Sequence, residues 1–126
     1  MSAARILVAD DDPGARALLA SILRAAGFSE IVQVADGQSA LAQLRETAPF
    51  ALAFLDIAMP VFTGIEVLTM AKLCQPACRW VLVSGHSALD NVLAGLNAGA
   101  SSFVVKPYAM VKIHDALTRC GMQGRY

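Results

Sequence analysis

Charge, cysteine and long apolar runs are all scarce in this sequence of 126 residues. Only 16% of the residues are charged and the formal net charge is +0, so we expect no nucleic-acid binding by this domain. No apolar run approaches the roughly 20 residues that cross a membrane, and the N-terminal residues do not resemble a signal peptide, so we expect no membrane contact. Apolar residues make up 56% of the chain, which excludes a disordered segment and favours one compact domain over residues 1–126.

The three cysteines, Cys74, Cys78 and Cys120, form no recognised motif. An odd number without a secretory signal argues against a disulfide framework, and the spacing of the first two fits neither a redox pair nor a zinc site. Small apolar side chains in or near the core are the simpler interpretation. We therefore expect a cytoplasmic protein in a reducing compartment.

Short apolar runs alternate with amphipathic segments along the chain, and this alternation predicts the fold class. The predicted strands cover residues 6–9, 31–35, 51–55, 80–83 and 102–105. Most of these runs are nearly continuous, as in strands covered on both faces, whereas residues 31–34 are mixed, as in an edge strand. Strand–helix units in succession predict an α/β fold, in which a parallel sheet carries helices on both faces with right-handed crossovers.

The predicted helices begin and end at recognisable signals. Asp12 can cap the first helix, Pro13 suits its first turn, and Gly27 ends it. Thr63 and Glu66 form a capping box at the start of the third helix. The other helices are predicted over residues 38–47, from residue 87, and from after residue 107 to residue 121. We expect residues 5–120 to form the core of the domain and residues 122–126 a loose tail.

Polar side chains interrupt the apolar strands at their carboxyl ends. These are Asp10, Asp11 and Asp12 after the first strand, Asp56 after the third, Ser84 after the fourth and Lys106 after the fifth. In an open α/β sheet the ligand crevice lies at those ends, so we expect these residues to converge although they are far apart in sequence.

Converging carboxylates need a cation, because two such charges about 5 Å apart repel by roughly 3 kcal/mol. Mg²⁺ prefers oxygen ligands and typically takes one or two carboxylates plus a phosphate oxygen. Lys106 adds one positive charge and Ser84 one hydroxyl donor. Together these groups predict a phosphoryl-transfer site, in which an aspartate such as Asp56 can itself accept the phosphoryl group.

Each of these residues also has a simpler explanation. Asp12 is better explained as a helix cap than as a ligand. Ser84 before Gly85 could equally be a turn residue, and Lys106 before Pro107 could be a solvated strand end. No histidine pairs with a serine or cysteine in a triad pattern, so triad hydrolysis is not supported. It is the joint placement of the polar residues that favours a site.

Five stretches of the chain resemble the receiver domains of bacterial response regulators, in the family's order and spacing. They are residues 6–13, 35–41, 55–60 with 63–66, 81–85 and 99–108. The resemblance covers about residues 5–120 and implies a single doubly wound (βα)5 flavodoxin-like domain, a five-stranded parallel sheet with strand order 2-1-3-4-5. It implies a phosphorylation switch, similar to the chemotaxis regulators, rather than a turnover enzyme.

The resemblance also implies roles for the acidic residues and their neighbour Ala58. Asp56 would be the phosphoacceptor. Asp11 would bind Mg²⁺, or Mn²⁺, directly, and Asp10 would help through water. Asp56 and the backbone carbonyl of Ala58 would be the remaining metal ligands.

Further roles follow from the same resemblance. Lys106 would contact Asp56 and then the phosphoryl group, beside a cis bond expected at Pro107. Ser84 would turn toward the phosphoryl group, and Phe103 would be the aromatic switch residue. Ala58 and His86 lie where side chains tune access of water to the acyl phosphate, and so its lifetime.

The sequence departs from the common family pattern at Phe103, which has no phenol hydroxyl. Burying this ring leaves no hydroxyl without a partner, so we hypothesise that it is biased inward even without phosphate. Val61, Phe62 and Thr63 replace the more usual residues before Gly64, so we expect an altered loop beside the site.

The implied partners are a histidine kinase or histidine phosphotransfer protein and a downstream protein target. The target would read the face formed by the fourth helix, the fifth strand and the fifth helix. No DNA-binding or catalytic segment follows Gly121, so output through protein partners is expected unless the chain is a piece of a longer one.

Two alternatives remain open at this stage. A haloacid-dehalogenase-like phosphatase also uses an aspartate nucleophile, a hydroxyl and a lysine at strand ends, but would be labelled on Asp10, and its first motif fails at Gly14. A receiver-like interaction module that no longer switches would not be phosphorylated at all.

Overall fold

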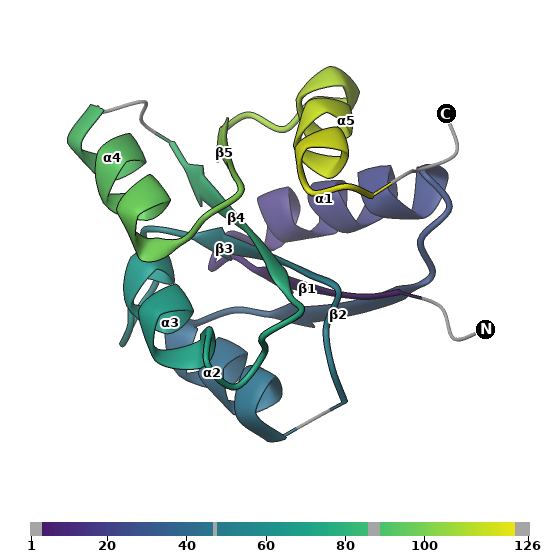
Figure 1. Ribbon diagram of the computed structural model, residues 1–126. Coiled ribbons are helices and arrows are strands. Elements are labelled where there is room, and N and C mark those ends of the chain that lie inside the picture. The colour runs from purple at the N-terminus through teal and green to yellow at the C-terminus, as the bar shows by residue number, and fades with distance from the viewer. Residues whose placement is uncertain (1–3, 47, 86–88, 123–126) are drawn as a thin grey trace.

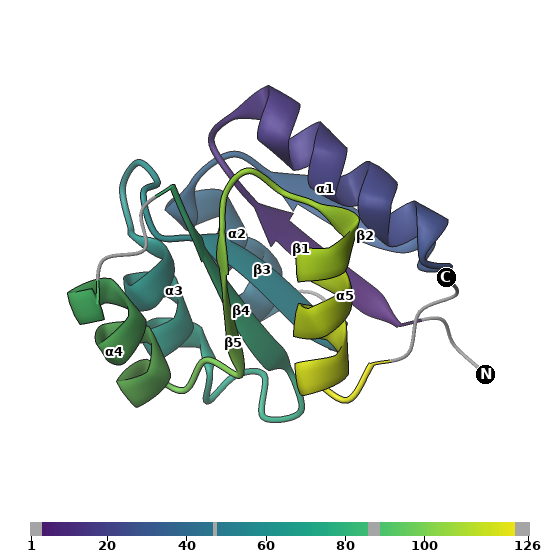
Figure 2. The same cartoon turned by 90° about the horizontal axis from the view of Figure 1, so that it is seen from above.

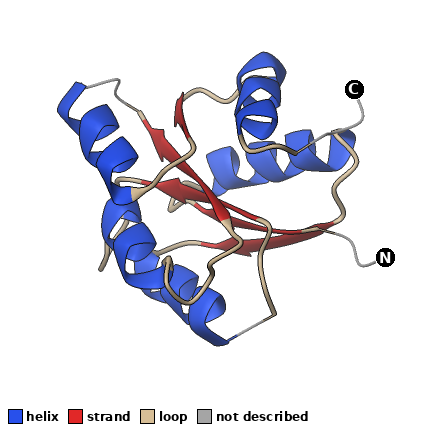
Figure 3. Ribbon diagram, viewed as in Figure 1, coloured by secondary structure: helices blue, strands red, loops and turns tan. Residues whose placement is uncertain are grey.

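The computed structural model describes residues 4–46, 48–85 and 89–122, in which strands and helices alternate (Figure 3). The strands are β1 (Arg5–Ala9), β2 (Glu30–Val34), β3 (Leu52–Asp56), β4 (Arg79–Ser84) and β5 (Ser102–Val105). The helices are α1 (Pro13–Ala25), α2 (Gly37–Glu46), α3 (Gly64–Ala71), α4 (Leu89–Ala98) and α5 (Met110–Arg119). Within the described residues, no helix is long and apolar enough to cross a membrane.

The strands form one parallel sheet in the order β2-β1-β3-β4-β5, which confirms the predicted α/β fold and strand order. Helices α1 and α5 cover one face of this sheet, and α2, α3 and α4 cover the other (Figure 1). The view from above shows the same two layers of helices on either side of the strands (Figure 2). The edge position predicted for the second strand is confirmed, because β2 pairs with β1 on one side only.

Alternate residues of the inner strands point to opposite faces and build two cores. On β1, Ile6 and Val8 join the core under α1 and α5, whereas Leu7 and Ala9 join the core under α2 and α3. Every residue of β3 is buried, as the nearly continuous apolar run predicts for a central strand. This central strand carries Asp56 at its end.

The predicted helix caps are confirmed. The Asp12 carboxylate accepts hydrogen bonds from the amides of Gly14 and Ala15, and Thr63 and Glu66 form the capping box of α3. Helix α1 ends at Ala25, slightly before the predicted end at Gly27, whose φ of 101° lies in the left-handed region.

Some predicted boundaries need correction. Asp56 and Ser84 are the last residues of β3 and β4 rather than the residues that follow them, because strand pairing continues to both. Asp56 lies opposite Val83, and Ser84 lies opposite Val105. The predicted start of the fourth helix at Ser87 and most of the predicted tail, residues 123–126, lie outside the described residues.

Candidate functional site

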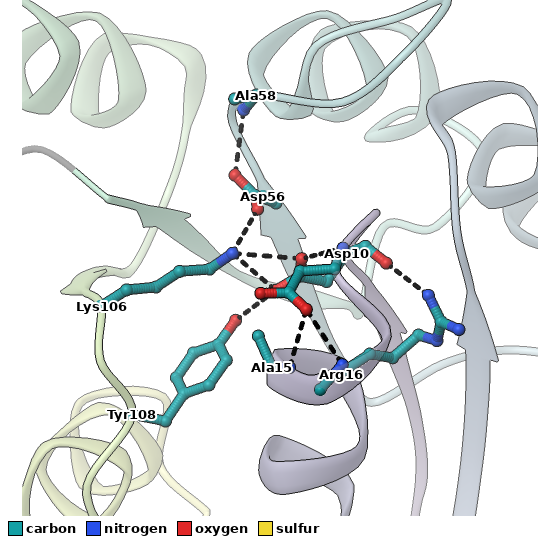
Figure 4. Close-up of polar contacts among 9 residues, drawn as sticks. Asp10, Ala15, Arg16, Asp56, Ala58, Lys106 and Tyr108 are labelled. Carbon is teal, nitrogen blue, oxygen red and sulfur yellow. Dashed lines mark hydrogen bonds and ion pairs between the residues drawn. The ribbon is translucent and has the colours of Figure 1, made fainter.

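Three of the predicted residues meet at the carboxyl edge of the sheet. Asp10 follows β1 directly, Asp56 ends β3, and Lys106 follows β5. The ammonium of Lys106 lies between the two carboxylates, with Nζ 2.7 Å from Oδ2 of Asp56 and 2.9 Å from Oδ2 of Asp10 (Figure 4). Both aspartates are buried, at 0% exposure for Asp10 and 3% for Asp56, so each negative charge depends on these protein contacts.

Asp10 is held from several directions. The backbone amide of Asp12 donates to its Oδ1 at 2.9 Å, and the hydroxyl of Tyr108 donates to its Oδ2 at 3.1 Å. Arg16, on the first turns of α1, donates to the Asp10 backbone carbonyl at 2.7 Å (Figure 4). Both the carboxylate and the backbone of Asp10 are therefore fixed before any ligand arrives.

Asp56 has a donor at each carboxylate oxygen. The Ala58 amide donates to Oδ1 at 2.9 Å and Lys106 donates to Oδ2 at 2.7 Å. Burial raises the pKa of Asp56 above its ordinary value, and the hydrogen bonds from Lys106 and Ala58 offset only part of that shift. Burial alone would lower the pKa of Lys106, but the two carboxylates reverse this and raise it, so the ammonium keeps its charge.

The acidic residues fit a hard divalent cation. Asp10, Asp11 and Asp56 each offer a carboxylate oxygen, and these oxygens all lie within 4.8 Å of one another. Asp11 is exposed, whereas the other two are buried. An all-oxygen donor set with more negative than positive charge is the chemistry that Mg²⁺ prefers, and Mn²⁺ can take similar sites.

Of the other predicted residues, Ser84 ends β4 at the same edge, whereas Phe103 lies within β5. Ser84 is buried, with 6% exposure, and its backbone carbonyl accepts from the Lys106 amide at 2.8 Å. Phe103 on β5 is half-buried against the core under α2 and α3. The Lys106–Pro107 peptide bond is cis, as the resemblance implies. His86 lies outside the described residues.

The loop between β3 and α3, which carries Ala58, rests against the start of α2. The Gly37 amide donates to the Pro60 carbonyl at 3.2 Å, and a Cβ at Gly37 would overlap the Phe62 carbonyl. Glycine is therefore required at this close approach. In the same loop Val61 has a φ of 72°, a left-handed backbone conformation unusual for a β-branched residue.

The sequence predictions gave no role to Tyr108 and Arg16, which both contact Asp10. A signal was available for the first of them. Tyr108 lies only two positions after Lys106, and this short separation predicts that its phenol lies near the same edge of the sheet. An aromatic residue after a proline is more often part of a core, and Tyr108 is indeed buried, with 7% exposure.

Comparisons with known proteins identify the family of this chain. Residues 6–118 match the family described as the response regulator receiver domain. The transcriptional regulatory protein PrrA of Mycobacterium leprae is 38% identical over 113 residues, which are 90% of this chain and 48% of PrrA. The chain thus spans about half the length of the curated relatives it matches first.

Solved structures share the fold. A CheY-like receiver domain from Methanospirillum hungatei superposes with a TM-score of 0.84 at 31% identity, over 93% of this chain and 92% of that one. The response regulator TrrA of Thermotoga maritima, solved in complex with Mg²⁺-BeF, gives 0.81 at 29% identity, over 93% and 98% of the two chains. The chain belongs to the response regulator receiver domains, the phosphoacceptor signalling domains of two-component systems.

Proposed function

We propose that Asp56 accepts a phosphoryl group from a phosphohistidine on a histidine kinase or histidine phosphotransfer protein, with Mg²⁺ bound beside it. The observation that carries this proposal is the Lys106 ammonium held between the buried carboxylates of Asp56 and Asp10. The cation would be held by Asp11, Asp10, Asp56 and the backbone carbonyl of Ala58. The complex of TrrA with Mg²⁺-BeF supports this choice of ion for a related fold.

The chemistry follows from the charges in the site. The Asp56 carboxylate attacks phosphorus, the bond from phosphorus to the imidazole nitrogen breaks, and the histidine leaves with that electron pair. Lys106, which contacts Asp56 at 2.7 Å, neutralises negative charge on the transferring group. Bound Mg²⁺ would supply further positive charge to the phosphoryl oxygens. The chain itself is modified and later loses the group, so it is not a turnover enzyme.

The donor has a direct approach to the site. An open groove beside Lys106 runs between the start of α1 and the loop between β5 and α5, and its walls include Asp12, Leu18 and Tyr108. Leu18 is 45% exposed on α1, so the groove offers apolar surface next to the reacting residues. A helical protein bearing the phosphohistidine would fit such a surface.

Phosphorylation would be read at the face of α4, β5 and α5. The phosphoryl group adds roughly one negative charge with strong acceptor oxygens, which the Ser84 hydroxyl would then contact. Phe103 would turn inward in response, and the inward bias of its ring stays a prediction. Apolar side chains on this face, Leu93, Leu96, Met110 and Val111, are 49–80% exposed and would suit a downstream protein target.

Two finer points also remain proposals. Ala58 and His86 would set the lifetime of the acyl phosphate, with the small Ala58 side chain offering little shielding from water.

We place the protein in the cytoplasm because its cysteines are free and two of them are buried, which fits a reducing compartment.

The experiment is incubation with acetyl phosphate and Mg²⁺, followed by intact mass and peptide mapping. We expect one added phosphoryl group on Asp56, lost in Asp56→Asn and when the cation is chelated. Asp115→Asn is the matched control, since Asp115 is 62% exposed on α5 and pairs with Arg119. Labelling of Asp10 would support the phosphatase alternative, and no labelling would support a module that does not switch. Phosphotransfer profiling against the histidine kinases of the source organism would then identify the donor.

A further inference from the structure

Tyr108 is a neutral side chain that donates a hydrogen bond to the buried acid Asp10. Its hydroxyl lies 3.1 Å from Asp10 Oδ2 and points at the carboxylate (Figure 4). Both partners are shielded from water, at 7% exposure for Tyr108 and 0% for Asp10. A carboxylate has no hydrogen to donate, so in this contact the phenol hydroxyl is the donor and Asp10 the acceptor.

The hydroxyl adds to a carboxylate that already has strong donors. Asp10 Oδ1 accepts from the Asp12 amide at 2.9 Å and from the Lys106 ammonium at 3.1 Å. The same ammonium lies 2.9 Å from Oδ2 as an ion pair. A further donor stabilises the Asp10 charge and fixes the orientation of the carboxylate. It also makes the electric potential around Asp10 less negative, which reduces the attraction that this acid exerts on a cation.

We propose that Tyr108 is a positioning residue that weakens divalent-cation binding by holding Asp10 through its hydroxyl. This inference rests on the proposed cation site at Asp10, Asp11 and Asp56. The hydroxyl stabilises the contacts of Asp10 with Lys106 and Tyr108, so a cation that draws on the same carboxylate would compete with them. Replacing the hydroxyl by hydrogen leaves the ring in place and removes only this competing contact.

The test measures Mg²⁺ binding by calorimetry and Mn²⁺ binding by electron paramagnetic resonance for wild type and Tyr108→Phe. We expect the dissociation constant of the variant to be lower by about threefold or more. Tyr108→Phe should melt at a lower temperature than wild type without cation, because buried Asp10 loses a donor. Saturating Mg²⁺ should raise the melting temperature of the variant more than that of wild type, because tighter binding stabilises the folded state further.

A double-variant cycle shows whether the effect passes through Asp10. In an Asp10→Asn background, Tyr108→Phe should leave the affinity for both cations unchanged. Trp80→Phe is the control for a general loss of packing, since Trp80 is buried on β4 in the core under α2 and α3. It should lower the melting temperature with and without Mg²⁺ by the same amount.

The outcomes separate this inference from the proposed function. If Tyr108→Phe binds Mg²⁺ no more tightly than wild type does, the proposed role of Tyr108 is wrong, while the proposed cation site is unaffected. Tightening by Tyr108→Phe that persists in Asp10→Asn would also overturn it. Wild type that binds neither cation would overturn the cation site and, with it, the inference.

Discussion

Val61 combines a β-branched side chain with a left-handed backbone conformation, at a φ of 72°. Such a conformation costs an ordinary L-residue about 1–2 kcal/mol, and only glycine and asparagine adopt it readily. The side chain is 66% exposed, so its packing offsets little of that cost. The strained residue lies in the loop that carries Ala58, next to the candidate cation site. Its backbone conformation lowers the free energy of unfolding of the protein.

Val61→Asn should therefore stabilise the protein. We expect the free energy of unfolding in urea to rise by about 1 kcal/mol, because asparagine tolerates the left-handed region. The matched control is Val111→Asn, at a valine of α5 that is 80% exposed. A gain of similar size at both positions would show that the backbone conformation of residue 61 is not the cause.

Single residues are where prediction from the sequence was least complete. The positive φ of Val61 could not be predicted from the local sequence, because valine rarely adopts that conformation and no turn motif surrounds it. Tyr108 was passed over because a buried aromatic ring usually serves a core. In both cases the tertiary environment, rather than local preference, decides what the residue does.

At the scale of elements, Gln75 ties the end of α2 to the start of β3. This side chain is buried, with 5% exposure, in the turn before β4. Its Nε2 donates to the Leu44 carbonyl at 2.8 Å, and its Oε1 accepts from the Phe50 amide at 3.0 Å. One amide group thus makes hydrogen bonds to two backbone groups from different segments of the chain.

Gln75→Ala should destabilise the protein by about 2–3 kcal/mol, because two buried hydrogen bonds to the backbone are lost. Urea unfolding measures this change. Gln38→Ala, on the exposed surface of α2, is the control and should stay within about 0.5 kcal/mol of wild type. Equal effects at the two positions would mean that the bridge formed by Gln75 contributes nothing specific.

The elements themselves were largely predictable, because their signals are local. Apolar runs gave the strands, and residues such as Asp12 and Thr63 marked the helix starts that the structure has. The ends of β3 and β4 were missed by one residue each, since pairing with the neighbouring strand decides where a strand ends. Gln75 could not be recognised, because its two partners come from segments distant in the sequence.

At the scale of the whole molecule, folding brings buried acids together and makes stability depend on pH. The pKa of Asp56 is raised in the folded chain, mainly by burial. The folded state therefore holds a proton that the unfolded chain has already released, and stability falls as pH rises through the raised pKa. The penalty is absent below the ordinary pKa of 3.8 and is complete only once the pH has passed the raised pKa.

Asp56→Asn should accordingly be more stable than wild type at neutral pH when no divalent cation is present. We expect this advantage to shrink as the pH is lowered through the raised pKa of Asp56 toward 3.8, in urea unfolding with a chelator. Asp115→Asn, at an exposed acid of α5, should bring no comparable gain at neutral pH. An advantage that is the same at every pH would contradict a raised pKa of Asp56.

The convergence of the site was predictable at this scale, because parallel strands place their carboxyl ends at one edge of the sheet. Asp10, Asp56 and Lys106 meet there as the strand order requires. The way in which Asp10 and Asp56 share the ammonium was not predictable, since it depends on side-chain orientations that strand order leaves open.

The position of Asp56 on β3 has a mechanical consequence. This strand is the middle one of five and is hydrogen-bonded to β1 on one side and β4 on the other, so its end is the least movable part of the sheet. Strand β5 is four residues long and has a neighbour on one side only. A change that begins at Asp56 on the central strand β3 should therefore cause movement at the edge strand β5, where rearrangement breaks the fewest backbone hydrogen bonds.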